Sequence, residues 1–273
     1  MNDATRFVFL HGIIPDRDVR LSPQVVLQRA SIRERQFEAF PNWSTNHVDE
    51  GILLIFLPKV TAQLKVTAPD DKAAAVASWN ANWDAILLSA IAAHQVSFNF
   101  ECDTSANNLS PTSTLRVTTY ALRGLSSEPP LQLVESEAAW LEKHFVTAQG
   151  LLKLELFTSA VHSLWSYRWH TVDRARLALL WSGLEGLFGV ESELSFRISL
   201  YVARFLEPED VDARRSLFTS TKQLYKDRSA AVHGSRIKGD PGASVAKSAE
   251  LLQRLIRRCI ELDGLPDPDG LAP

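Results

Sequence analysis

Arg228 and His233 are the residues of this sequence whose types and spacing most directly suggest chemistry. A long arginine beside a histidine near a helix end can converge with it on one small anion, where the guanidinium stabilises negative charge. An imidazole titrates near neutral pH, so it can accept or donate a proton during a reaction. The two residues are therefore candidates for acid–base chemistry on an anionic substrate.

Helical periodicity places two charged residues on faces that should be apolar. When residues 212–233 are wrapped at 3.6 residues per turn, Arg228 falls near the middle of an apolar stripe, and within 172–189 Glu185 falls among Ala178, Trp181 and Phe188. The stripe around Arg228 contains Leu217, Thr221, Leu224, Tyr225, Ala231 and Val232. An isolated buried charge is costly, so we expect Glu185 and Arg228 to form an ion pair.

Structural explanations of the same residues remain open. An arginine–glutamate pair can simply tie two helices together. His233 precedes Gly234 in the last turn of a helical pattern, where a histidine interacts favourably with the negative helix end and a glycine adopts the left-handed cap. Five residues along an ideal helix, the side chains of Arg228 and His233 also diverge by more than a right angle.

Secondary-structure patterns divide the chain into an α+β N-terminal region and an all-α helical bundle. Residues 1–125 are expected to form the first domain, with a helix over 70–95, and residues 134–264 the second. The segment SSEPP at 126–130 has the character of a linker. Strands are expected at 6–13, 51–60, 96–101 and 113–122, and the later helices at 135–147, 150–169, 172–189, 194–207, 212–233 and 244–262.

Composition is typical of a globular protein and limits the possible partners. The 273 residues are 45% hydrophobic and 22% charged, with a net charge of −3, so nucleic acid could be bound only through a local basic cluster. Two cysteines, no leader-like start and no long apolar run indicate a cytoplasmic protein without a membrane partner. Because no HExxH, P-loop or dinucleotide motif is present, we expect no metal and no cofactor.

Two segments resemble a known family. LLWSGLEGLF at 179–188 and LYKDRSAAVHG at 224–234 are similar, in order, separation and helical context, to motifs of the HEPN domain, in particular its Apea-like branch. The resemblance covers roughly residues 151–262. It implies an α-helical bundle that usually forms a homodimer, and many members are metal-independent endoribonucleases.

The resemblance also implies roles for individual residues. Arg228 would contact the scissile phosphate of RNA, His233 would act as general acid or base, and Glu185 would hold Arg228 in place. The position after the arginine, often Asn, Asp or His in active members, is Ser229 here, which is expected to contact the substrate through its shorter side chain. Tyr225, one turn before it, is either a further substrate contact through its hydroxyl or an aromatic residue at the edge of the core. Further RNA contacts are expected from Arg236 and Lys238, with Arg254, Arg257 and Arg258 as a possible phosphate track or a solvated helix face.

Two functions follow from the resemblance. The first is an endoribonuclease in prokaryotic defence or with a toxin-like role, in which residues 1–125 sense a trigger or bind a regulatory partner. The second is a non-catalytic HEPN protein that binds RNA, a nucleotide or a partner and mediates dimerisation. Ser229 and the acidic net charge favour the second function.

Overall fold

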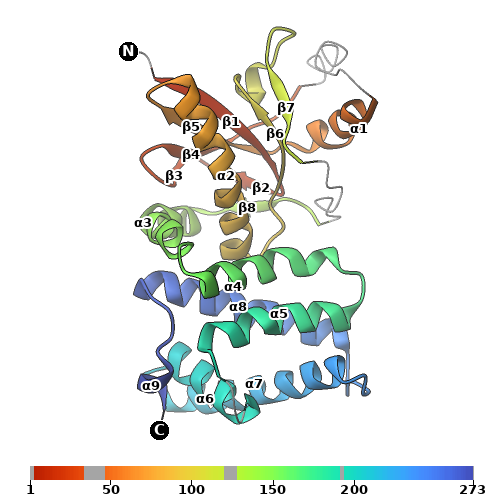
Figure 1. Cartoon of the computed structure of the whole chain (residues 1–273), viewed down its shortest axis with the longest axis vertical. Coiled ribbons are helices and arrows are strands. Elements are labelled where there is room, and N and C mark those ends of the chain that lie inside the picture. Colours follow the sequence, from red (N-terminus) through yellow and green to blue (C-terminus); the bar gives the residue numbers. More distant parts are fainter. Residues whose placement is uncertain (1–2, 34–46, 120–127, 191–193, 273) are drawn as a thin grey trace. The chain divides into compact units, whose positions relative to one another are not determined.

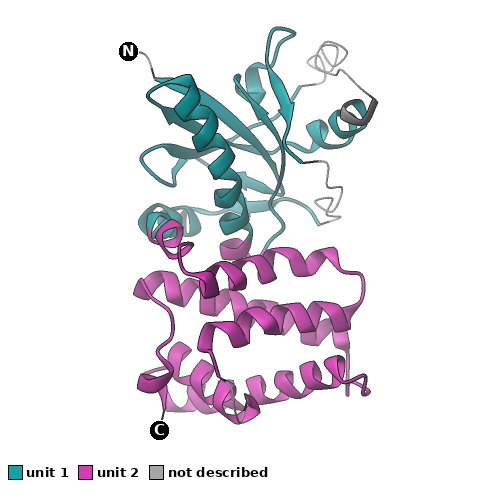
Figure 2. Ribbon diagram, viewed as in Figure 1, with its two compact units in different colours: residues 1–89, 94–146 teal, residues 90–93, 147–273 magenta. Residues whose placement is uncertain are grey.

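The chain forms two compact units in the computed structural model (Figure 1), which describes residues 3–33, 47–119, 128–190 and 194–272. The first unit comprises Met1–Ser89 and His94–Val146, and the second comprises Ala90–Ala93 and Thr147–Pro273 (Figure 2). An antiparallel sheet with helices is therefore followed by a mostly helical part, as the sequence predicts. No helix in the described ranges is long and apolar enough to cross a membrane.

The first unit is built on a six-stranded sheet in the order β3-β4-β5-β1-β6-β7. All neighbouring strands of this sheet are antiparallel, and a separate parallel pair joins β2 to β8. The strands are β1 Ala4–His11, β2 Ile13–Pro15, β3 Val19–Arg20, β4 Val25–Arg29, β5 Ala62–Ala68, β6 Ser97–Cys102, β7 Leu115–Val117 and β8 Leu131–Leu133. The helices are α1 His47–Phe56, α2 Asp71–Ala92 and α3 Glu135–Leu151, with short 3₁₀ turns at Leu57–Lys59 and Ala106–Asn108.

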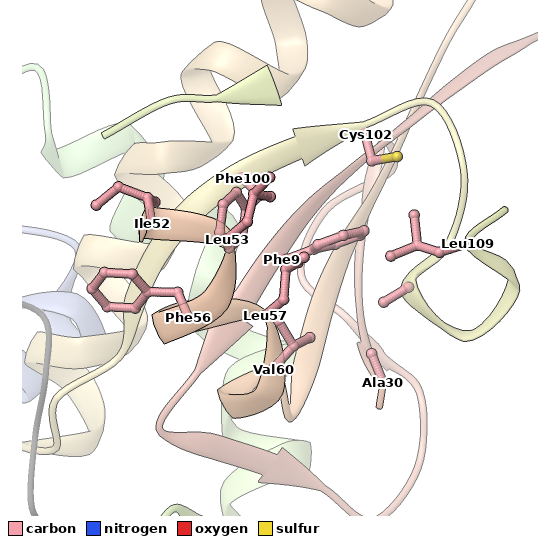
Figure 3. Close-up of a cluster of buried hydrophobic side chains, with 11 residues drawn as sticks. Phe9, Ala30, Ile52, Leu53, Phe56, Leu57, Val60, Phe100, Cys102 and Leu109 are labelled. Atoms are coloured by element: carbon pink, nitrogen blue, oxygen red, sulfur yellow. The ribbon is translucent and has the colours of Figure 1, made fainter. Parts of the chain in front are cut away.

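The sequence-based prediction of a strand over 51–60 is wrong, because this segment forms α1 and the 3₁₀ turn that follows it. Leu54 and Ile55 are 63% and 38% exposed, whereas Ile52, Leu53, Phe56 and Leu57 are buried, which is the spacing of a helix and not the alternation of a strand. Ile52, Leu53, Phe56 and Leu57 pack with Phe9, Phe100 and Cys102 in one hydrophobic cluster (Figure 3). A short apolar run fits a strand and a buried helix equally well, so only its packing against the sheet decides between them.

The other elements expected in the first unit are found, with changed limits. The apolar run at 6–13 is divided at Gly12, whose φ of +97° suits glycine and whose added Cβ would lie 2.0 Å from the carbonyl oxygen of Gln95. β6 and α2 lie where they are expected, and β7 is shorter than the predicted 113–122, of which residues 120–122 lie outside the described residues. The sequence patterns do not predict the remaining strands, which are β2, β3, β4, β5 and β8.

The second unit follows the predicted helices closely. Helix α5 packs against α4, α7 and α8, and α7 also packs against α6. Gly189 ends α5 with φ +58°, and Asp210 and Asp240 cap the starts of α7 and α8 through backbone amides. The helices are α4 Glu155–Ser166, α5 Asp173–Phe188, α6 Leu194–Leu206, α7 Val211–Val232, α8 Pro241–Leu262 and α9 Pro268–Leu271, with a 3₁₀ turn at Tyr167–Trp169.

The division between the units lies later than the expected boundary at 126–134. Most of α3 belongs to the first unit, which extends to Val146. Within this unit Arg17 binds α3, since its guanidinium donates to Glu135 at 2.8 Å and to Glu142 at 2.7 Å. The sequence of residues 135–147 predicts that they form a helix. It does not predict which of the two units this helix belongs to.

Candidate functional site

An ion pair between α5 and α7 is the centre of the candidate site. Nη2 of Arg228 donates to Oε2 of Glu185 at 2.9 Å, and the two side chains are 20% and 19% exposed. This is the pairing that the helical spacing predicts. Both groups are largely removed from water without being sealed from it, so a charged ligand can still reach them.

Each partner retains hydrogen-bonding capacity. Oε1 of Glu185 and Nε of Arg228 are buried and have no hydrogen-bond partner among the described residues. Burial raises the pKa of the Glu185 carboxyl, and the positive charge of Arg228 opposes this rise. The pair is therefore joined by one hydrogen bond, and not by the two parallel hydrogen bonds of a bidentate arginine–carboxylate pair.

Aromatic side chains support the guanidinium from α7 and α5. Cζ of Arg228 lies 5.6 Å from the ring centroid of Tyr225, and the Tyr225 ring meets Trp181 edge to face at 5.4 Å. Trp181 is buried, and its Nε1 donates to the hydroxyl of Ser248 on α8 at 3.1 Å. Burial and the nearby Glu185 carboxylate raise the pKa of Tyr225. The tyrosine thus restricts the position of Arg228 by packing against it.

His233 ends α7 and is exposed. Its backbone N–H donates to the carbonyl of Ser229 at 3.0 Å, and Gly234 follows with φ +75°, which is the left-handed cap that the sequence predicts. Within the described parts of the chain its imidazole makes no hydrogen bond, and none joins it to the guanidinium of Arg228. The ring is therefore open to a solvent-borne ligand.

Arg174, on α5, binds the C-terminal end of α7 close to His233. Its guanidinium donates to the carbonyls of Ala230 at 2.9 Å, Ala231 at 3.2 Å and Ser235 at 2.6 Å. Although Arg174 lies on the same helix as Glu185, its guanidinium binds the end of α7 through these three bonds. They satisfy carbonyls that the end of a helix leaves without intrahelical partners.

The remaining predicted residues lie in several places. Ser229 is half-buried beside Arg228, and Arg236 is exposed in the loop after α7. Lys238 lines a groove between α7 and α8 that includes neither Arg228 nor His233. On α8, Arg254 is paired with Glu207 and Arg258 with Glu261, so these two arginines are partly neutralised.

The groove and its acidic residue were missed by the sequence reasoning. Asp227 is 7% exposed and lies in the groove wall. A signal was present, because Asp227 lies three residues after Leu224 and four before Ala231, both of which are buried on α7. The same periodicity that singles out Arg228 therefore also applies to Asp227.

No group of three or more His, Cys, Asp or Glu side chains in the described ranges is arranged to hold a metal ion. Comparisons with protein-family models, with curated proteins and with solved structures find no match for this chain. Its function must therefore be inferred from its residues and their geometry.

Proposed function

We propose that the second unit is a metal-independent endoribonuclease of the HEPN type and that it acts as a homodimer. The observation that carries this proposal is the arrangement on α7, where a guanidinium fixed by a carboxylate lies one and a half turns from an exposed imidazole at the helix end. The family motifs around Glu185, Arg228 and His233 support the same function.

Arg228 supplies the positive charge of the proposed reaction. With Nη2 held by Glu185, its remaining N–H groups can donate to the non-bridging oxygens of a phosphodiester. A guanidinium that is already oriented and partly desolvated stabilises the charge of the transition state without reorganising. Glu185 and Tyr225 are positioning residues, since each contacts Arg228.

His233 transfers the protons. The 2′-hydroxyl oxygen of the RNA attacks the phosphorus, the bond from phosphorus to the 5′-oxygen breaks, and a 2′,3′-cyclic phosphate and a 5′-hydroxyl remain. One proton leaves the 2′-hydroxyl and one reaches the 5′-oxygen, and an imidazole can perform either transfer. In a homodimer, two copies of His233 can divide these transfers between them.

Other residues extend the proposed RNA contact. Ser229 and Arg236 are close in sequence to the catalytic pair and can donate hydrogen bonds to the RNA backbone. Lys238 adds a positive charge on the side of the groove between α7 and α8. The first unit would sense a trigger or a regulatory partner, as a defence or toxin-like role in a prokaryotic cytoplasm requires.

The test compares His233→Ala with the unchanged protein on total RNA in EDTA. His170→Ala serves as the matched control, because His170 is also exposed in the second unit but is not on α7. We expect cleavage with cyclic phosphate ends by the unchanged protein and by the control, and none by His233→Ala. Size-exclusion chromatography with light scattering determines whether the active species is a dimer.

A non-catalytic function is the second candidate, and one observation favours it. Ser229, a short side chain, occupies the position where active HEPN proteins often carry Asn, Asp or His. In that case Arg228→Ala would weaken RNA or nucleotide binding, whereas His233→Ala would leave it unchanged. Binding and cleavage measured on the same two variants distinguish the candidates.

A further inference from the structure

A groove between α7 and α8 lies apart from the candidate site. Both helices pack closely on α5 but only sparsely on each other, which leaves a cavity of about 540 Å³. Most of its lining residues lie within 217–227 of α7 and 243–254 of α8, and neither Arg228 nor His233 is among them. Cavities of this volume are typical of small-molecule sites.

The wall of the groove on α7 contains a buried carboxylate without a cationic partner. Asp227 is 7% exposed, and its two oxygens accept one hydrogen bond each, from the Ser244 hydroxyl at 2.7 Å and from the Gln223 amide at 3.2 Å. No salt bridge joins it to a basic side chain in the part of the chain that the structure describes. A carboxylate oxygen can accept two hydrogen bonds, and a buried charge is usually paired. Asp227 can therefore accept a further donor, and a positively charged donor would also neutralise it.

The wall of the groove on α8 contains a cation without a carboxylate partner. Lys247 is exposed, lines the groove and forms no salt bridge with any carboxylate of the described ranges. It follows Ser244, the residue that donates to Asp227, by three positions, so Ser244 and Lys247 are neighbours on one face of α8. The groove thus has a negative group on one wall and, one helical turn along, a positive group on the other.

The groove becomes apolar beyond these two charges. Leu224 lies one turn before Asp227 on α7, and Leu251 lies one turn after Lys247 on α8. Because the connecting loop joins the end of α7 to the start of α8, both leucines are farther from that loop than the charges are. Thr221 lies beside them, fully buried, and its hydroxyl has no hydrogen-bond partner among the described residues. This part of the groove suits an apolar side chain, and Thr221 offers a hydrogen bond to a polar group at its end.

The charges of the whole lining balance. Three acidic and three basic side chains line the groove. Besides Asp227 and Lys247 they include Arg254, which is bound by Glu207 at 2.6 Å, and Asp240, which caps the start of α8. The remaining two are exposed and have opposite charges. A ligand with one positive and one negative group therefore matches the lining better than a simple cation or a simple anion does.

We propose that the α7/α8 groove binds a free α-amino acid, with its ammonium group on Asp227, its carboxylate on Lys247 and its side chain along Leu224 and Leu251. The ammonium group has three N–H donors, and Asp227 has acceptor positions that its two neutral partners leave open. The carboxylate binds where the groove is open to solvent, because Lys247 is exposed. An α-amino acid supplies a charged partner for both walls at once, which an amine or a carboxylic acid cannot do.

The test measures binding to the full chain by calorimetry. Leucine and glutamine are the probes, because leucine fits the apolar part of the groove and glutamine adds a polar end for Thr221. Each is compared with an analogue that lacks the ammonium group and with one that lacks the α-carboxylate, which for leucine are isocaproate and isoamylamine. We expect the amino acid to bind at least about tenfold more tightly than either of its analogues.

Two variants test the two ends of the ligand separately. In Lys247→Ala the amino acid should bind no more tightly than its analogue without the carboxylate, and in Asp227→Asn no more tightly than its analogue without the ammonium group. Lys222→Ala is the matched control, because Lys222 lies on α7 but does not line the groove, and it should leave binding unchanged. If Asp227→Asn fails to fold, Lys247→Ala still decides the proposal, because Lys247 is exposed.

Three results would overturn the proposal: no binding of either amino acid at millimolar concentration, binding that Lys247→Ala retains in full, or an analogue that binds as tightly as its amino acid. The residues of the proposed cleavage reaction do not line the groove, and no RNA is present in the binding experiment. The cleavage proposal and this one can therefore fail independently.

Discussion

Replacement of Arg228 by methionine should leave the largely buried Glu185 carboxylate without a positively charged partner. Methionine keeps an apolar stem against Tyr225 but removes the charge that lies 2.9 Å from the carboxylate. Breaking a fully buried ion pair typically costs about 3–5 kcal/mol, and an exposed pair about 0–1 kcal/mol. Since both side chains are about one-fifth exposed, we expect a loss of about 2–3 kcal/mol in the free energy of unfolding near neutral pH.

The loss should depend on pH with a definite sign. Burial already raises the pKa of Glu185 above its ordinary 4.5, and removal of Arg228 removes the influence that lowers it. The folded protein then binds a proton on Glu185 more tightly than the unfolded chain does, so stability falls as pH rises from the unfolded pKa through the folded one. The loss caused by Arg228→Met should therefore be largest near neutral pH and smaller near pH 4.5.

Thermal unfolding followed by calorimetry at about pH 5 and about pH 7.5 measures this difference, with an expected fall in Tm of roughly 5–10 °C at the higher pH. The double variant Glu185→Gln with Arg228→Met has no unpaired buried charge, so it should recover most of the lost stability. Equal losses at both pH values, or a double variant no more stable than Arg228→Met, would show that Glu185 is not the group that Arg228 neutralises.

Three further stability predictions follow from single contacts, each checked by calorimetry. Arg174→Ala should cost about 2 kcal/mol because it loses three carbonyl bonds at the end of α7, whereas Arg215→Ala, in an exposed pair, should cost less than about 1 kcal/mol. Gly183→Ala should destabilise by about 1–3 kcal/mol, since an added Cβ would lie 2.8 Å from a side-chain carbon of α4, and Gly186→Ala, with open space around it, should be neutral or stabilising. Burial lowers the pKa of His11 from 6.5 to about 4, so the folded protein binds its proton less tightly than the unfolded chain. Stability should fall by about 3 kcal/mol as pH decreases through that interval, and His11→Gln should remove this dependence.

The helical unit was predictable because its signals are local. Helices α5, α7 and α8 carry apolar residues at a spacing of three and four, and the positive φ of Gly189 and Gly234 lies where the pattern ends. The sheet was not predictable to the same extent. β4 and β5 pair across more than 30 residues, and each is short enough that its own composition leaves it ambiguous.

The candidate site was predictable in part for a related reason. A charge on an apolar stripe needs a partner, and this argument led from Glu185 to Arg228. The role of Arg174 depends on where the end of α7 lies in space, which its position on α5 does not reveal. Asp227 was missed because its partners Gln223 and Ser244 are neutral, so no opposite charge in the sequence points to it.

The cyclic phosphate formed on RNA in EDTA is the most direct measure of the central claim that Arg228 and His233 act together on a phosphodiester. The chain and its His170→Ala variant should both produce fragments with 2′,3′-cyclic phosphate ends, while His233→Ala should produce none and unfold at the same temperature as the unchanged protein. Cleavage by His233→Ala at the rate of the His170→Ala control would contradict the claim, as would the absence of cleavage by the unchanged protein.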